Sequence, residues 1–171
     1  MIRFRILIRL PIAAFGGGLL LKAEIQDQIA AWNRLDKRTN EIYHRVAAHF
    51  GFSDTSFWVL YTLCESTETY TQNSLADAWC YPRQTLNSCI ANLVKAGYLY
   101  LQQQPGAHRG KAIMLTEAGR ELCRRTIQPV LEAERRAFSR MTSKQRSKLL
   151  ALAELQCSFL QEEIESLACQ G

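Results

Sequence analysis

The sequence predicts a mainly α-helical protein with one small β-hairpin, an α+β fold, and three observations support this prediction. Between Thr71 and Thr116 the pattern reads as a short helix, a tight turn, a longer helix, a strand, a glycine-bearing loop and a second strand. Stretches with helical spacing of apolar residues precede this segment, and others follow it. The combination is typical of a winged helix-turn-helix lobe joined to a helical dimerisation region that the N- and C-terminal helices form.

The longer helix of this segment is expected to begin at Pro82, because the proline ring suits a first helical position. Leu86, Ile90, Leu93 and Val94 then share one apolar stripe. The opposite side is short, polar and nearly uncharged, and it consists of Gln84, Ser88, Ala91, Asn92 and Lys95. Amides and hydroxyls both donate and accept hydrogen bonds, as recognition of base edges in a major groove requires. The alternative is a half-buried helix whose polar face is only solvated.

A predicted hairpin follows this helix directly. Ala96-Gly97 supplies a helix stop, and residues 98–103 alternate with a period of two. Residues 104–110 carry a proline and two glycines, as a turn should, and residues 112–115 return as a second strand. His108, Arg109 and Lys111 lie at the tip or just after it. A hairpin with these cations, placed after a helix of this kind, indicates a wing that meets phosphates or a minor groove.

These residues resemble the DNA-binding core of MarR-family transcriptional regulators. The resemblance rests on TQNSLADAW before the turn, PRQTLNSCIANLVKAGYL for the recognition helix and HRGKAIMLTEAG for the wing and the start of the next helix. It extends more loosely from about residue 25 to about residue 164. Each motif alone is weak, but their order and spacing together are specific.

The resemblance implies a bacterial, cytoplasmic transcriptional regulator that is not an enzyme and needs no cofactor. Its partners would be double-stranded DNA, a second copy of itself and a small aromatic ligand bound between the dimerisation helices and the DNA-binding lobe. In such a homodimer the two recognition helices are about one DNA turn apart, which predicts a roughly palindromic operator. Ligand binding would release a repressor from that operator.

The predicted DNA-binding residues fall into three groups. The base-reading group at the start of the recognition helix is Gln84, Thr85, Asn87 and Ser88. The group expected to contact the DNA backbone is Arg83 and Lys95 with Arg109 and Lys111 from the wing. The remaining predicted contacts are Thr71, Gln72, Asn73 and Asn92.

Two positions depart from the family pattern. Ala107 stands where the family usually has an acidic residue two places before the wing arginine, so the ion pair that steadies the wing tip is missing. Cys80 stands in the turn where the family often has glycine. We therefore expect either a differently opened turn or a mildly strained Cys80.

Net charge alone does not indicate a nucleic-acid partner. The 171 residues carry a formal charge of +5, but Arg3, Arg5, Arg9 and Lys22 contribute +4 of it and leave +1 for the rest of the chain. The DNA prediction therefore depends on the motif. The predicted organisation is a leader (1–22), an N-terminal dimerisation helix (23–52), a winged helix-turn-helix lobe (53–116) and C-terminal dimerisation helices (117–171).

The leader is predicted to lie outside the fold. Its arginines and small residues faintly resemble a secretory signal, but Arg9, Pro11 and three glycines interrupt its apolar runs. It is also too short in apolar residues to span a membrane. A disordered extension, translated from an upstream start codon, is the competing interpretation.

The helices that flank the lobe predict a dimer. The N-terminal helix, one long helix or two in line, carries Ile25, Ile29, Trp32, Leu35, Ile42, Val46 and Phe50 at helical spacing. The last helix carries Leu149, Leu152, Leu155, Phe159, Leu160, Ile164 and Leu167. One small lobe can hardly cover both apolar surfaces, so we expect the ends of two chains to interleave.

The six cysteines suggest neither a disulfide framework nor a metal site. No Cys-x-x-Cys pair occurs, and the three histidines are not clustered with cysteines. Cys80 and Cys89 are candidates for a thiol switch, because oxidation of either would disturb the DNA-reading helix. The sequence has no phosphate loop, His-Glu-x-x-His motif or nucleophile elbow, so we predict no enzyme. A winged-helix protein-interaction module without DNA binding is the remaining alternative.

Overall fold

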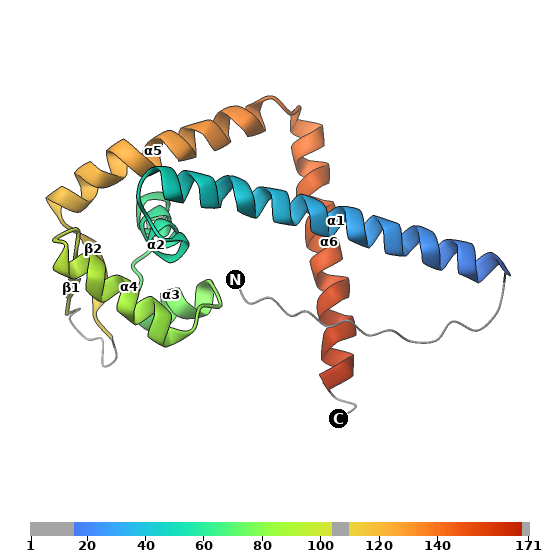
Figure 1. The fold of residues 1–171 in the computed structure, drawn as a ribbon, viewed down its shortest axis with the longest axis horizontal. Coiled ribbons are helices and arrows are strands. Elements are labelled where there is room, and N and C mark those ends of the chain that lie inside the picture. Colours follow the sequence, from blue (N-terminus) through green and yellow to red (C-terminus); the bar gives the residue numbers. More distant parts are fainter. Residues whose placement is uncertain (1–15, 104–109, 169–171) are drawn as a thin grey trace. The chain divides into compact units, whose positions relative to one another are not determined.

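The computed structural model describes residues 16–103 and 110–168, and it has the predicted mainly helical architecture with one hairpin (Figure 1). The elements in chain order are α1 (Gly16–His49), α2 (Asp54–Glu65), α3 (Gln72–Ala78), α4 (Arg83–Lys95), β1 (Leu99–Gln102), β2 (Ala112–Leu115), α5 (Glu117–Ser139) and α6 (Ser143–Ala168). The chain divides into two compact units, residues 1–127 and residues 128–171, and each is described by itself.

Helix α1 is one continuous helix that starts earlier than predicted. It begins at Gly16, so residues 16–22 of the predicted leader are helical and only residues 1–15 of it lie outside the described residues. Leu21, Lys22 and Ala23 are strong helix formers, and a helix that already has its nucleus extends through such residues at little cost. The helix ends as predicted before Gly51, which has a φ of +75°.

The core of the first unit is built from every helix-turn-helix element. Its fully buried side chains are Phe57, Val59 and Leu60 of α2, Leu75 of α3, Leu86 and Ile90 of α4, Leu99 of β1 and Ile127 of α5. Burying one large apolar side chain contributes about 1.5–3 kcal/mol relative to leaving it in water. This shared core therefore fixes α4 against α2 and α3 and holds the hairpin beside it.

Side-chain caps set the helix boundaries that the sequence predicts. Ser53 Oγ accepts from the backbone N–H of Ser56 at 3.2 Å, which begins α2. Thr71 and Ser74 form a reciprocal capping box at α3. Each such cap satisfies an N–H group that the helix itself cannot pair, and contributes about 1 kcal/mol.

The wing strands pair antiparallel, with Leu99 opposite Leu115 and Gln102 opposite Ala112. Beyond them, Ala112 also forms an isolated bridge with Thr71, and the Ile113 N–H donates to the Tyr70 carbonyl at 2.8 Å. The hairpin is thereby attached to the chain that enters α3.

The first turns of α5 belong to the lobe rather than to a separate dimerisation region. Cys123, Thr126 and Ile127 are buried, so the lobe continues past the predicted boundary at residue 116. Pro129 lies within α5 just after this buried stretch and removes one backbone hydrogen bond from the helix.

The second unit holds the rest of α5 and all of α6. A capping box begins α6, because Thr142 Oγ1 accepts from the Gln145 N–H and Gln145 Oε1 accepts from the Thr142 N–H. The apolar side chains of α6 remain largely exposed, including Leu155 at 47%, Phe159 at 57% and Ile164 at 56%. This unit by itself leaves that surface uncovered.

Within the described part of the chain, no helix combines the length and the apolar character that crossing a membrane requires.

Candidate nucleic-acid interface

Helix α4 presents the polar face that the sequence predicts. Gln84, Thr85, Asn87 and Ser88 are all exposed, and so are Asn92 and Lys95 further along. None of these polar groups is used by the core, which Leu86, Ile90 and Leu93 enter from the other side. The helix therefore offers a row of short amide and hydroxyl side chains to an external partner.

The predicted apolar stripe is wrong at one position, Val94. Val94 is 36% exposed, whereas Cys89 is buried at 8% exposure. Successive residues turn by about 100° around a helix, so Cys89 lies three positions after Leu86 and on its side, while Val94 falls at the edge of the stripe. The Cys89 thiol lies 3.3 Å from Ser56 Oγ on α2.

The start of α4 has no side-chain cap. Pro82 is the N-cap residue rather than the first helical residue, and it has no side-chain hydrogen bond to offer. Arg83, Gln84 and Thr85 begin the helix in exposed positions. Because the first N–H groups of a helix have no partner within it and carry partial positive charge, this end suits an anion such as a phosphate.

Arg83 is not a free cation at this end. One of its guanidinium nitrogens lies 3.6 Å from an Asp77 carboxylate oxygen on α3, and both side chains are exposed. An exposed ion pair of this kind is worth about 0–1 kcal/mol, so a phosphate can compete for the arginine. The sequence did not suggest this pair, because the two residues belong to different helices.

The turn between α3 and α4 is strained at Cys80, one of the two expected outcomes. Cys80 has a φ of +50°, the only non-glycine residue with positive φ in the described parts of the chain. The Tyr81 N–H donates to the Ala76 carbonyl at 3.0 Å, which closes the turn back onto α3. The left-handed backbone conformation costs free energy for an L-residue with a side chain, which is why glycine is common at such a turn.

Trp79 remains 37% exposed, whereas Leu75 and Ala76 of the neighbouring helix α3 are buried. Its indole N–H donates to Thr62 Oγ1 at 2.9 Å, and its ring lies 4.9 Å from that of Trp58. A tryptophan keeps one polar atom that needs a partner, so the ring lies across the surface of α2 rather than entering the core.

The predicted DNA-binding residues at the start of α3 differ in how exposed their side chains are and in whether the fold already uses them. Asn73 is exposed and Gln72 is half-buried. Thr71 is half-buried, and its hydroxyl is engaged with Ser74 in the capping box. Thr71 therefore acts first as a structural residue, whereas Asn73 is available to a partner.

The wing contributes Lys111, which is exposed immediately before β2. The bridge between its neighbour Ala112 and Thr71 brings this lysine close in space to the start of α3. Arg109, His108 and Ala107 lie outside the described residues. The predicted roles of Arg109 and of the missing wing acid therefore remain predictions.

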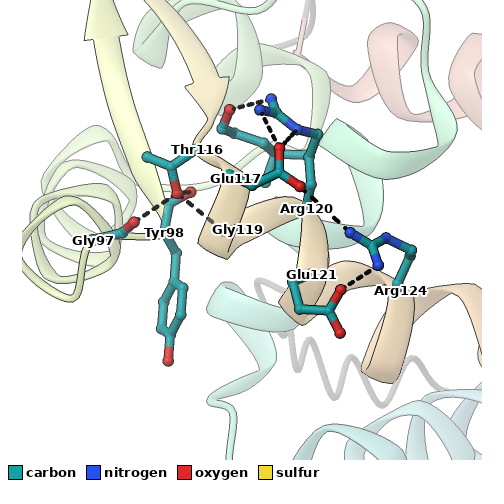
Figure 2. Close-up of polar contacts among 9 residues, drawn as sticks. Gly97, Tyr98, Thr116, Glu117, Gly119, Arg120, Glu121 and Arg124 are labelled. Atoms are coloured by element: carbon teal, nitrogen blue, oxygen red, sulfur yellow. Dashed lines mark hydrogen bonds and ion pairs between the residues drawn. The ribbon is translucent and has the colours of Figure 1, made fainter.

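Thr116 joins the wing to α4 and α5 (Figure 2). Its hydroxyl donates to the Gly97 carbonyl at 2.6 Å, just past the end of α4, and accepts from the Gly119 N–H at 2.9 Å as the cap of α5. Arg120 bonds both the Glu117 carboxylate and the Leu115 carbonyl, and its hydrogen bond lowers the pKa of Glu117. These contacts fix the hairpin relative to the end of α4.

The charges of the lobe are balanced in number. Residues 53–116 contain the acids Asp54, Glu65, Glu68 and Asp77 and the cations Arg83, Lys95, Arg109 and Lys111. All four cations belong to the predicted DNA-binding set, and among the described residues Asp77 is the acid that pairs with one of them, Arg83. The lobe is therefore close to neutral without lacking basic groups at the candidate interface.

The described cysteines are all free thiols. Burial raises the pKa of Cys89, which disfavours the reactive thiolate there. Cys80 is exposed at the strained turn. Of the two candidates for a thiol switch, the structure therefore favours Cys80 over Cys89. Among the described residues, no group of three or more His, Cys, Asp or Glu side chains is placed to bind a metal ion.

A cleft of about 730 Å³ opens beside the helix-turn-helix. It is lined by Asp36, Lys37, Asn40, Glu41, Tyr43 and His44 from α1, by Asp54, Thr55 and Trp58 from α2, and by Trp79 and Tyr81 from the turn. The sequence analysis missed this feature, because its walls come from three segments that are far apart in the chain.

No family model matches the sequence, and no curated protein matches it. Solved structures do. A MarR family regulator from Neisseria meningitidis aligns with a TM-score of 0.70 at 19% identity, covering 81% of this chain and 97% of that one. S. aureus MepR in its DNA-binding conformation aligns at 0.66 and 19% identity, covering 78% and 98%.

This chain has the MarR winged-helix fold. CouR from Rhodococcus jostii, bound to p-coumaroyl-CoA, shares the MarR fold with a TM-score of 0.61 at 21% identity, covering 75% of this chain and 91% of CouR. At these identities the likeness is one of fold. It confirms the predicted fold class.

Proposed function

We propose that this chain is a homodimeric transcriptional regulator that binds a roughly palindromic operator in duplex DNA. One observation supports it most: α4 exposes Gln84, Asn87 and Ser88 along a face that the described residues of the lobe leave open. Such side chains can recognise base edges when the helix lies in a major groove. The proposal includes the bacterial cytoplasm as its compartment and no catalytic activity.

The backbone contacts come from the ends of this face. Arg83 and the uncapped start of α4 meet one phosphate group, and Lys95 and the wing cations meet others. With the wing arginine included, a dimer makes about six to eight such contacts, and the logarithm of the binding constant then falls with the logarithm of salt concentration at a slope of about −5 to −7.

Dimerisation is supported by apolar surface that the chain leaves exposed. Ile29 and Trp32 on α1 are 47% and 46% exposed, and the α6 surface described above is similarly open. Apolar surface of this extent is typical of an interface rather than of a monomer surface. A two-fold dimer would place two copies of α4 about one DNA turn apart.

Repression and its release by a ligand form the finer part of the proposal. A dimer bound to a palindromic operator blocks access to the DNA that it covers. A molecule that changes the spacing of the two recognition helices lowers the affinity of the dimer for that operator. The fold neighbour CouR binds p-coumaroyl-CoA. The cleft beside the turn is large enough for a small ligand in this chain.

The decisive experiment is selection of bound fragments from genomic DNA by the purified full chain, followed by titration of the enriched duplex. We expect one enriched motif with two inverted half-sites, bound with the salt dependence given above. Gln84→Ala and Ser88→Ala should relax sequence preference, since base contacts carry the specificity.

Charge variants separate backbone contacts from a general loss of binding. Lys111→Ala should weaken binding to all sequences and reduce the magnitude of the salt slope by about two per dimer. Arg109→Ala should do the same. Lys148→Ala, an exposed lysine on α6, serves as the control and should leave operator affinity unchanged.

The interaction-module alternative is favoured by the neutral charge balance of the lobe. It predicts no enrichment of any DNA and no binding even at about 20 mM salt, where nonspecific electrostatic binding is strongest. That result would overturn the proposed function.

A further inference from the structure

The cleft beside the turn has an aromatic wall. The Tyr43 and Trp58 rings lie 4.8 Å apart, and Trp58 and Trp79 follow at 4.9 Å with planes 32° apart. The hydrogen bond from the Trp79 indole to Thr62 holds the last ring in place. Three rings from α1, α2 and the turn therefore form one continuous surface along the cleft.

The charged groups of the cleft are mainly carboxylates. Asp36, Glu41 and Asp54 line it, against one lysine, Lys37. Glu41 is paired at 2.6 Å with Arg45, which is not part of the lining. The partners of the other two are Asn40, which donates to Asp36 at 3.1 Å, and His44, whose Nδ1 lies 2.9 Å from Asp54. The lining therefore holds three carboxylates and one lysine, besides the His44 imidazole.

Tyr81 adds a polar but uncharged group. Burial raises the pKa of its hydroxyl, so it remains protonated at neutral pH. Tyr81 is the last residue of the turn and directly precedes Pro82, the N-cap residue of α4.

We propose that this cleft binds a small organic cation that carries a flat apolar group. The cation is attracted to the faces of Trp58 and Trp79 and to the three carboxylates that line the cleft, those of Asp36, Glu41 and Asp54. An organic anion would meet these carboxylates with a single lysine to offset them. This inference names the ligand class of the proposed regulator and in that respect rests on the proposed function. The binding itself requires no DNA.

Occupancy of the cleft acts on the start of the recognition helix. Trp79 and Tyr81 form its wall on the turn, and between them Cys80 holds the strained φ of +50°. A ligand that displaces these two rings also displaces the segment that determines where α4 begins. Operator affinity should therefore change with the ligand, because a ligand that favours one position of the turn also favours one position of the start of α4.

Two probes of nearly equal shape and opposite charge test the proposal on the full chain. Tetraphenylphosphonium and tetraphenylborate are titrated separately at pH 8 and low salt, with calorimetry and quenching of tryptophan fluorescence as readouts. We expect the phosphonium to bind about tenfold or more tightly than the borate. Equal binding, tighter binding of the borate, or no binding of the phosphonium at millimolar concentration would overturn the proposal.

Charge and ring variants locate the binding. The double variant Asp36→Asn/Glu41→Gln should weaken phosphonium binding about fivefold, and Trp79→Leu should weaken it by a similar factor. Asp27→Asn, which removes an exposed carboxylate from α1 outside the cleft, should have no effect. Circular dichroism of each variant establishes that it is folded. Asp36 and Glu41 are exposed, so their replacement in the double variant should not unfold the protein.

The failure of the two proposals can be distinguished. If the phosphonium binds with this pattern but no DNA is selected, the ligand site stands and the regulator proposal fails. If DNA is selected but the phosphonium does not bind, the cation proposal fails and the regulator proposal stands. If both bind, the phosphonium should shift the operator titration, and Trp79→Leu should abolish that shift.

Discussion

At the scale of single residues, Gly119 lies directly against the backbone of Tyr98. A Cβ atom there would lie 2.0 Å from the Tyr98 carbonyl oxygen, an atom that no side-chain rotation can move. Alanine favours a helix over glycine by about 1 kcal/mol. The clash outweighs this gain, because it forces α5 away from the end of α4.

Gly119→Ala is therefore expected to destabilise the protein by about 1–3 kcal/mol, as overpacking of a closely packed site does. The measurement is urea unfolding followed by circular dichroism. Ala118→Ser, at the exposed neighbouring position, should change stability by no more than about 0.5 kcal/mol. An unchanged midpoint for Gly119→Ala would contradict the close approach.

Cys80 gives the opposite expectation. Its positive φ costs an L-residue about 1–2 kcal/mol, and glycine adopts it freely but loses more chain entropy on folding. Cys80→Gly should raise the stability by about 0.5–1 kcal/mol in the same urea measurement. Cys80→Ala removes the thiol without relieving the backbone, so it should give no gain. A gain for both variants would attribute the effect to the thiol instead.

At the scale of elements, α3 and α4 share an ion pair, between Asp77 and Arg83, at the proposed DNA interface. Asp77 occupies one side of Arg83 and places a negative charge close to the expected phosphate. The pair is exposed and adds little to stability. Its main effect should therefore appear in affinity rather than in folding.

Asp77→Asn should tighten binding to operator and unrelated duplexes alike, by about threefold at low salt, because it removes repulsion from the DNA backbone without adding a base contact. Fluorescence anisotropy of labelled duplexes measures this. Asp27→Asn removes an acid outside the interface and should not change affinity. Weaker binding of Asp77→Asn would mean that the pair positions Arg83 for its contact.

At the scale of the whole molecule, the chain exposes apolar surface on α1 and on α6 that neither unit covers by itself. Substitution of exposed residues there costs the single chain little, since they are not part of its core. Their energetic effect belongs to association between chains. This separation makes the proposed dimer testable without unfolding the lobe.

The double variant Ile29→Glu/Phe159→Glu should give a folded monomer by light scattering, because it places charges in the proposed interface. Operator affinity should then fall by about 100-fold, since one half-site can no longer assist the other. Lys144→Glu introduces the same acidic side chain at an exposed position in the first turn of α6 and should remain dimeric. If the double variant Ile29→Glu/Phe159→Glu stays dimeric, the interface lies elsewhere.

Much of the lobe could be predicted from local patterns. The caps at Ser53, Thr71 and Thr116 follow from side chains that bond within three residues, and such bonds are readable from sequence. The exposed face of α4 follows from helical periodicity in the same way. The start of α1 at Gly16 could not be read, because no capping residue marks a boundary there and a helix propagates until something stops it.

Other features depended on neighbours distant in the sequence. Cys89 is buried because Ser56 and the core of α2 lie against it, and Val94 is at the edge because nothing covers it. Trp79 stays at the surface because its indole N–H finds Thr62. In both cases the partner is supplied by another helix, so composition and spacing within one helix could not decide the outcome.

The sequence by itself determined the order of the elements, the helix caps and the polar character of the recognition face, because each depends on interactions within a few residues. Only the tertiary structure decided that Arg83 faces Asp77, that Gly119 must lack a side chain, and that aromatic rings from three segments line one cleft. Those features arise where separate helices meet, and the distances between their side chains are set by how the shared core packs.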